Sequence, residues 1–166
     1  WFLGAAILTI LPTYCRDLMR GDATVVNLFL ATFTIGIAVG SLLAEKLSFD
    51  RVEIGLVPIG SFGLTVTLIM LFWFRPEWVV SSDSVHYITW TQFLALESGR
   101  KIFGSLFLLA IFAGLYTVPL YTLVQSRSDK KVRSQVVASN NIINAFFMVI
   151  SCIQIVPKPS PFIKEA

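Results

Sequence analysis

Five long stretches of the chain contain no charged side chain, and this feature constrains the fold more than any other. The stretches are residues 1–15, 23–44, 54–74, 102–126 and 134–157. A helix rises about 1.5 Å per residue, so about 20 apolar residues cross the hydrocarbon core of a bilayer. Four of the stretches reach that length. They predict membrane-spanning helices, because a helix satisfies its own backbone hydrogen bonds in lipid.

The composition supports a membrane protein. Only 14% of the 166 residues are charged, whereas a soluble domain has about 25%. This deficit excludes a solvated enzyme domain, a disordered tail and a nucleic-acid-binding arm, so we expect no nucleic-acid partner. We predict an all-α, polytopic transmembrane helix bundle that contacts membrane lipid. Its five spans are expected at about 1–14, 25–43, 54–74, 102–124 and 136–156.

The first stretch is shorter than the others and starts at residue 1 without an initiator Met. We expect a span cut off at its start, in a chain that is part of a longer protein. A signal peptide is the alternative. It would need a basic segment and a small-residue cleavage site, and neither is present.

The basic residues predict an orientation. The loops 45–53 and 125–135 fall on one side of the membrane and hold six Lys and Arg residues in short segments. The opposite side has seven, spread over longer segments. This density favours the first side as cytoplasmic. Arg100 and Lys101 argue against it, because they adjoin the fourth span on the opposite side.

The segment 75–101 contains the aromatic residues Trp78, Tyr87, Trp90 and Phe93 among polar ones. Aromatic side chains with a polar edge favour the headgroup region of a membrane. We therefore predict a short interfacial helix near residues 87–96, with an ordinary exposed loop as the alternative. His86 is interpreted as a surface histidine.

Small residues in two spans predict close helix contacts. Gly36 and Gly40 form a GxxxG pattern, and Ala110 and Gly114 have the same spacing. In lipid, helices associate through close backbone approach and buried polar groups. Pro119 inside the fourth span permits a bend in that helix.

Polar residues inside two apolar spans predict a site. Asn140 and Asn144 are one turn apart on one helix face that Ser151 continues. Asparagine facing lipid would leave its amide without partners, so these side chains should face other helices or a wet cavity. The alternative is interhelical hydrogen bonding that only holds the bundle, at about 0.6 kcal/mol per bond. The candidate substrate-cavity residues are Asn140, Asn144, Asn141, Tyr121, Gln125 and Thr117.

No catalytic or cofactor pattern accompanies these residues. No charged residue lies in the middle of a span, and the sequence has no phosphate-binding P-loop. Cys15 and Cys152 lack the spacing of a metal site and are expected to be buried apolar thiols. We therefore expect no enzyme, no cofactor and no metal in this chain.

Residues 40–51 read GSLLAEKLSFDR. This segment resembles the cytoplasmic signature of the major facilitator superfamily, roughly G-x-L-a-D-R-x-G-R-R, with serine, glutamate and lysine in place of the family's Gly, Asp and Arg. The resemblance implies a cytoplasmic latch, an ion pair that favours one conformational state and breaks in the other. The latch residues would be Ser41, Glu45, Lys46 and Arg51.

Three further segments, 51–63, 114–125 and 133–148, are similar to the lysophospholipid transporter branch of that superfamily, most specifically over 114–148. The resemblance implies the seventh to eleventh of twelve spans, in the C-terminal half of a carrier of the bacterial inner membrane. That carrier would move a lysophosphatidylethanolamine-like lipid by alternating access, together with its other half and a fused or partner acyltransferase. The alternatives are a carrier for another small molecule and a non-transporting structural fragment.

Overall fold

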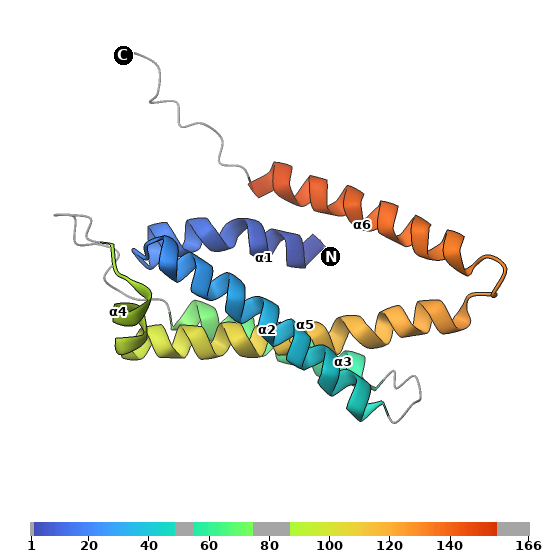
Figure 1. Ribbon diagram of the computed structural model, residues 1–166, viewed down its shortest axis with the longest axis horizontal. Helices are drawn as coiled ribbons and strands as arrows, with labels where there is room; N and C mark the ends of the chain where they lie inside the picture. Colours follow the sequence, from blue (N-terminus) through green and yellow to red (C-terminus); the bar gives the residue numbers. More distant parts are fainter. Residues whose placement is uncertain (1, 49–54, 75–86, 156–166) are drawn as a thin grey trace, which may run out of the picture.

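The computed structural model describes residues 2–48, 55–74 and 87–155 (Figure 1). Over these residues the chain is all-α, and its β-type pairing is a single isolated bridge between Gly21 and Ile88. The elements are α1 (Phe2–Thr13), a π-helical turn (Tyr14–Leu18), α2 (Ala23–Leu47), α3 (Leu56–Trp73), α4 (Trp90–Ala95), α5 (Glu97–Arg127) and α6 (Arg133–Ile155).

Four of the five predicted spans are present as helices long and apolar enough to cross a membrane. They are α2, α3, α5 and α6. The first predicted span forms the 12-residue α1, which continues into the π-helical turn and is shorter than the other four. The prediction of an all-α helical bundle is confirmed.

Large apolar side chains cover the outside of these helices. On α3, Phe62 is 72% exposed, Phe72 67% and Trp73 79%. On α6, Ile142 and Ile153 are 70% and 69% exposed. A surface this apolar is unfavourable in water and favourable in hydrocarbon. The described part of the chain therefore has the surface of a helical membrane protein.

Helix α5 is the centre of the bundle, because it packs along both α2 and α3 (Figure 1). Helix α6 packs chiefly against α1 and meets α5 only near the turn that joins the two helices. The buried residues of α5 end at Pro119, so its last two turns leave the packed bundle and approach α6.

Small residues allow α5 to approach its neighbours closely, as the sequence predicts. A Cβ atom added to Gly40 would lie 2.1 Å from the Ile111 carbonyl oxygen, and one on Gly114 would lie 2.7 Å from the Ile37 carbonyl oxygen. A Cβ atom on Gly36 would lie 2.5 Å from that of Ala110. The predicted GxxxG contact therefore joins α2 and α5.

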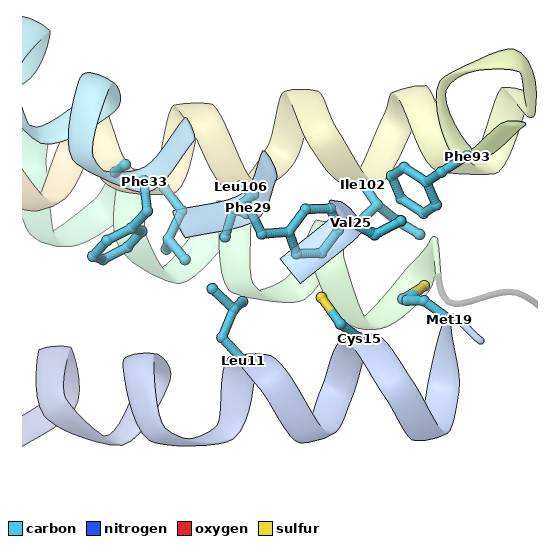
Figure 2. Packing of buried hydrophobic residues seen from close by; sticks show 11 residues of the cluster. Leu11, Cys15, Met19, Val25, Phe29, Phe33, Phe93, Ile102 and Leu106 are labelled. Atoms are coloured by element: carbon cyan, nitrogen blue, oxygen red, sulfur yellow. The ribbon is translucent and has the colours of Figure 1, made fainter. Parts of the chain in front are cut away.

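An apolar cluster joins the first helices to the end of α5 where the chain enters it (Figure 2). Phe29 of α2 and Phe93 of α4 form an edge-to-face pair with ring centroids 5.3 Å apart. The buried members are Leu11, Cys15, Met19, Val25, Phe29, Phe33, Phe93, Ile102, Leu106, Leu109 and Ala110. This cluster fixes α1, α2, α4 and α5 relative to one another.

The two cysteines differ in environment. Cys15 is buried, as predicted, but Cys152 is exposed, so that half of the prediction is wrong. The reason is that α6 is covered along little of its surface, chiefly by α1. The Sγ atom of Cys152 lies 3.7 Å from Thr9 Oγ1 of α1, a contact that either atom can donate.

The predicted short helix is present as α4. Thr89 and Gln92 form a capping box at its start, and the backbone N–H of Trp90 donates to Thr24 Oγ1 at 3.1 Å. The N–H of Ile88 donates to the Arg20 carbonyl at 2.8 Å, which ties this segment to the start of α2. The location of α4 at a membrane interface stays a prediction.

Asp22 begins α2 as its N-cap. Its carboxylate accepts hydrogen bonds from the Thr24 hydroxyl and from the backbone N–H groups of Thr24 and Val25. The Thr24 hydroxyl is the largest of the influences that lower the pKa of Asp22. The anionic form also suits the positive end of the helix dipole.

Arg100 and Lys101, which argued against the predicted orientation, both have local partners. Arg100 Nη1 donates to the carbonyl oxygens of Ala95 at 3.0 Å and Leu94 at 3.3 Å, at the end of α4. Lys101 Nζ lies 2.7 Å from the Glu97 carboxylate. The two cations therefore have local partners at this end of α5, and the membrane orientation stays a prediction.

Candidate functional site

The polar residues predicted on the fourth and fifth spans meet. The Tyr121 hydroxyl of α5 accepts a hydrogen bond from Asn144 Nδ2 at 3.1 Å and one from Asn140 Nδ2 at 3.3 Å. The two asparagines can converge on one hydroxyl because they are one helical turn apart. The contact lies just beyond Pro119, where α5 has left α2 and α3.

Two hollows flank this contact. The inner groove has a volume of about 160 Å³ and is lined by Tyr116, Thr117, Leu120, Tyr121, Val124 and Asn140. The outer groove has a volume of about 480 Å³ and is lined by Val124, Val132, Gln135, Val136, Ser139, Asn140 and Ile143. Val124 and Asn140 belong to both, so the two grooves adjoin beside the turn between α5 and α6.

The structure brings together four of the six predicted cavity residues. Asn140, Tyr121 and Thr117 line the inner groove, and Asn144 joins them through Tyr121. Gln125 and Asn141 are exposed and line neither groove. Asn141 differs because one residue along a helix turns the side chain by about 100°.

The sequence interpretation missed one member of the polar face of α6, Arg133. Arg133, Asn140, Asn144 and Ser151 have spacings that return to nearly the same direction on a helix. Together they extend over about 27 Å of helix. The Arg133 Nε and Ser151 Oγ atoms are buried and have no hydrogen-bond partner among the described residues. The helical spacing alone places Arg133 on the same face as Asn140 and Asn144, but the sequence interpretation used Arg133 only as a charge that sets the membrane orientation.

The predicted latch residues are only partly described. Ser41 donates from Oγ to the Ile37 carbonyl at 2.8 Å, and its backbone nitrogen faces Gly114 at the α2–α5 contact. Glu45 and Lys46 are exposed in the last turns of α2. Arg51 lies outside the described residues, so the latch stays a prediction.

The described ranges contain no group of three or more His, Cys, Asp or Glu residues that could hold a metal ion. Within them, the chemistry of the grooves is that of neutral amide and hydroxyl groups beside apolar walls. Such groups orient a ligand by hydrogen bonds.

Comparisons with protein-family models, with curated proteins and with solved structures find no match to this chain. The class of protein is therefore defined by the fold alone. It is an all-α helical bundle whose four long apolar helices indicate a membrane protein.

Proposed function

We propose that this chain is part of the C-terminal half of a major facilitator carrier, and that the carrier moves a lysophospholipid across the bacterial inner membrane. The substrate would be similar to lysophosphatidylethanolamine and would reach the cytoplasmic leaflet by alternating access. A fused or partner acyltransferase would then reacylate it. The family assignment rests on the sequence resemblance described above.

One observation carries the proposal. Tyr121, Asn140 and Asn144 bring polar groups together between two mainly apolar helices, beside grooves with mainly apolar walls. A lysophospholipid has a polar head and one acyl chain, and it needs both kinds of surface. An amide offers a carbonyl acceptor as well as its N–H donors, so each asparagine can hydrogen-bond a head group.

The size of the grooves supports a site shared with the rest of the carrier. A pocket that encloses a small-molecule ligand has a volume of about 300–1,000 Å³. The inner groove, which Tyr121 lines, is too small for this at about 160 Å³, whereas the outer groove reaches about 480 Å³ but is lined by neither Tyr121 nor Asn144. The described residues would then form one wall, and the other half of the carrier would supply the opposite one.

The direct test measures transfer of labelled lysophosphatidylethanolamine into spheroplasts that carry the full-length gene. We expect transfer above the empty-vector level, and we expect residues 1–166 expressed alone to give none. No transfer from the full-length gene would remove the lipid substrate. Competition by a sugar or a drug, with no competition by unlabelled lysolipid, would favour another small-molecule carrier.

A structural role is the second candidate, and a specific contact favours it. Both asparagines already have a partner in Tyr121, as expected if these bonds only hold α5 to α6. Full transport by a carrier that lacks the Tyr121 hydroxyl would support this second candidate.

The latch gives a further prediction. Replacing Lys46 and Arg51 together by alanine should reduce transport more than it reduces the amount of protein in the membrane, because a broken ion pair shifts the balance between two states. The matched control is Arg16→Ala with Arg127→Ala, which removes two exposed charges outside the predicted latch. If transport and the amount of protein in the membrane fall equally, Lys46 and Arg51 only set the orientation of the chain in the membrane.

A further inference from the structure

The turn between α5 and α6 concentrates positive charge beside the outer groove. Residues 127–133 contain four basic side chains and one acidic one. A carboxylate oxygen of Asp129 accepts from the backbone N–H of Lys131 at 3.2 Å. Among the described residues, the ion pair is Lys101–Glu97, at the start of α5. No carboxylate of the described residues therefore forms an ion pair with the basic side chains of the α5–α6 turn.

Arg133 is the partly buried cation of this group, whereas Arg127, Lys130 and Lys131 are exposed. Its side chain is partly buried, and its Nε atom is buried without a partner among the described residues. A buried N–H without an acceptor is unfavourable, and more so on a charged group. An anionic acceptor that reaches this nitrogen would remove the penalty. A guanidinium group matches phosphate oxygens in pairs.

The outer groove has mainly apolar walls, to which Gln135, Ser139 and Asn140 add polar groups. Val132 and Val136, on either side of Arg133 in the sequence, line the outer groove with Val124 and Ile143. A free phosphate ion would gain nothing from such walls, whereas an acyl chain would be covered by them. Positive charge next to an apolar groove at the end of two membrane-length helices fits an anionic lipid.

We infer that the α5–α6 turn and the outer groove form a binding site for an anionic phospholipid. The guanidinium group of Arg133 binds the lipid phosphate, Lys130 and Lys131 add positive charge, and one acyl chain lies along the outer groove. This inference does not rest on the transport proposal, because it requires only a chain that sits in a membrane.

The test uses the full-length protein in detergent and measures binding of phosphatidylglycerol and of phosphatidylcholine by native mass spectrometry. We expect phosphatidylglycerol to bind more tightly. Arg133→Gln should weaken its binding by about tenfold, since hydrogen bonds to charged groups are the strong ones. Arg133→Lys should recover part of this loss, because it keeps the charge but not the paired donors.

Two further variants make the test specific. Arg16→Gln is the matched control, because it removes an exposed charge from the π-helical turn after α1, outside both the α5–α6 turn and the predicted latch. It should change binding little. Ser139→Trp fills the outer groove and should weaken phosphatidylglycerol binding while the basic residues stay in place. Size-exclusion profiles identify variants that fail to fold, and the exposed pair Lys130→Gln and Lys131→Gln replaces Arg133→Gln if that variant does.

Three results would overturn the inference. Equal effects of Arg133→Gln and Arg16→Gln would mean a diffuse attraction of charge and no defined site. Equal binding of the two lipids would remove the anionic requirement. Displacement of phosphatidylglycerol by inorganic phosphate alone, with no effect of Ser139→Trp, would indicate a site for a soluble anion.

Discussion

Replacing Gly40 by leucine will separate α2 from α5 and destabilise the bundle more than any single change to its polar residues. Even a methyl group at this position would lie 2.1 Å from the Ile111 carbonyl oxygen. That atom belongs to the backbone of α5, so no side-chain rotation relieves the contact. Overpacking in a well-packed core costs about 1–3 kcal/mol, and we expect the upper end of this range or more. Thermal unfolding of the full-length protein in detergent, followed by circular dichroism, measures the loss.

The matched control is Gly104→Ala, a substitution in α5 at a position where an added Cβ atom meets nothing within 4 Å. Alanine is more favourable than glycine inside a helix by about 1 kcal/mol, so this variant should be as stable as the parent or slightly more stable. Gly40→Ala makes the same chemical change at the contact and should be destabilising. If both alanine variants unfold at the same temperature, the close approach of α2 and α5 is wrong.

The main helices could be predicted from the sequence, because the signal for them is local. A charge-free run of about 20 residues has few alternatives to a helix in lipid. Spacing also places Gly36 and Gly40 on one face and Ala110 and Gly114 on another, which predicts close helix contacts, and the structure adds that these two faces meet each other. The observed helix ends differ from the predicted span ends by a few residues, because capping residues such as Asp22 determine where a helix begins.

Contacts between distant segments were beyond the sequence interpretation. The bond from Trp90 to Thr24 and the bridge between Gly21 and Ile88 join residues more than 60 positions apart. No pattern near either segment indicates the other. The partners of Arg100, the carbonyl oxygens of Leu94 and Ala95, depend in the same way on the turn between α4 and α5.

The candidate site was predictable as two polar faces but not as a set of contacts. Spacing identified Asn140, Asn144 and Tyr121, and the structure adds that both amides reach the same hydroxyl. Spacing grouped Gln125 with Tyr121 at i+4, but the structure leaves Gln125 exposed near the end of α5 and outside both grooves. Arg133 was missed because a basic residue at the end of a span also serves the positive-inside rule.

Replacing Asn144 by leucine should lower lysophospholipid transport by about tenfold, which corresponds to about 1.4 kcal/mol of lost binding or transition-state stabilisation. Leucine keeps the size of the side chain but removes every hydrogen-bonding group. The structural cost should be small, because an interhelical hydrogen bond in a membrane contributes about 0.6 kcal/mol. Uptake of labelled lysolipid per molecule of carrier in the membrane measures the effect.

Asn141→Leu is the matched control, because it makes the same change at an exposed position that lines neither groove. It should leave transport near the parent level.

Tyr121→Phe then separates the two roles of the contact. If the amides only hold α5 to α6, the stability effects of Tyr121→Phe and Asn144→Leu overlap, because both remove the same bond, and transport per molecule stays unchanged. If the amides also bind the head group, Tyr121→Phe removes the hydroxyl that orients both asparagines. Transport per molecule of carrier should then fall even where the protein remains stably folded. Normal transport by Asn144→Leu would mean that Asn144 has only a structural role, and the proposed substrate site would then lose its main support.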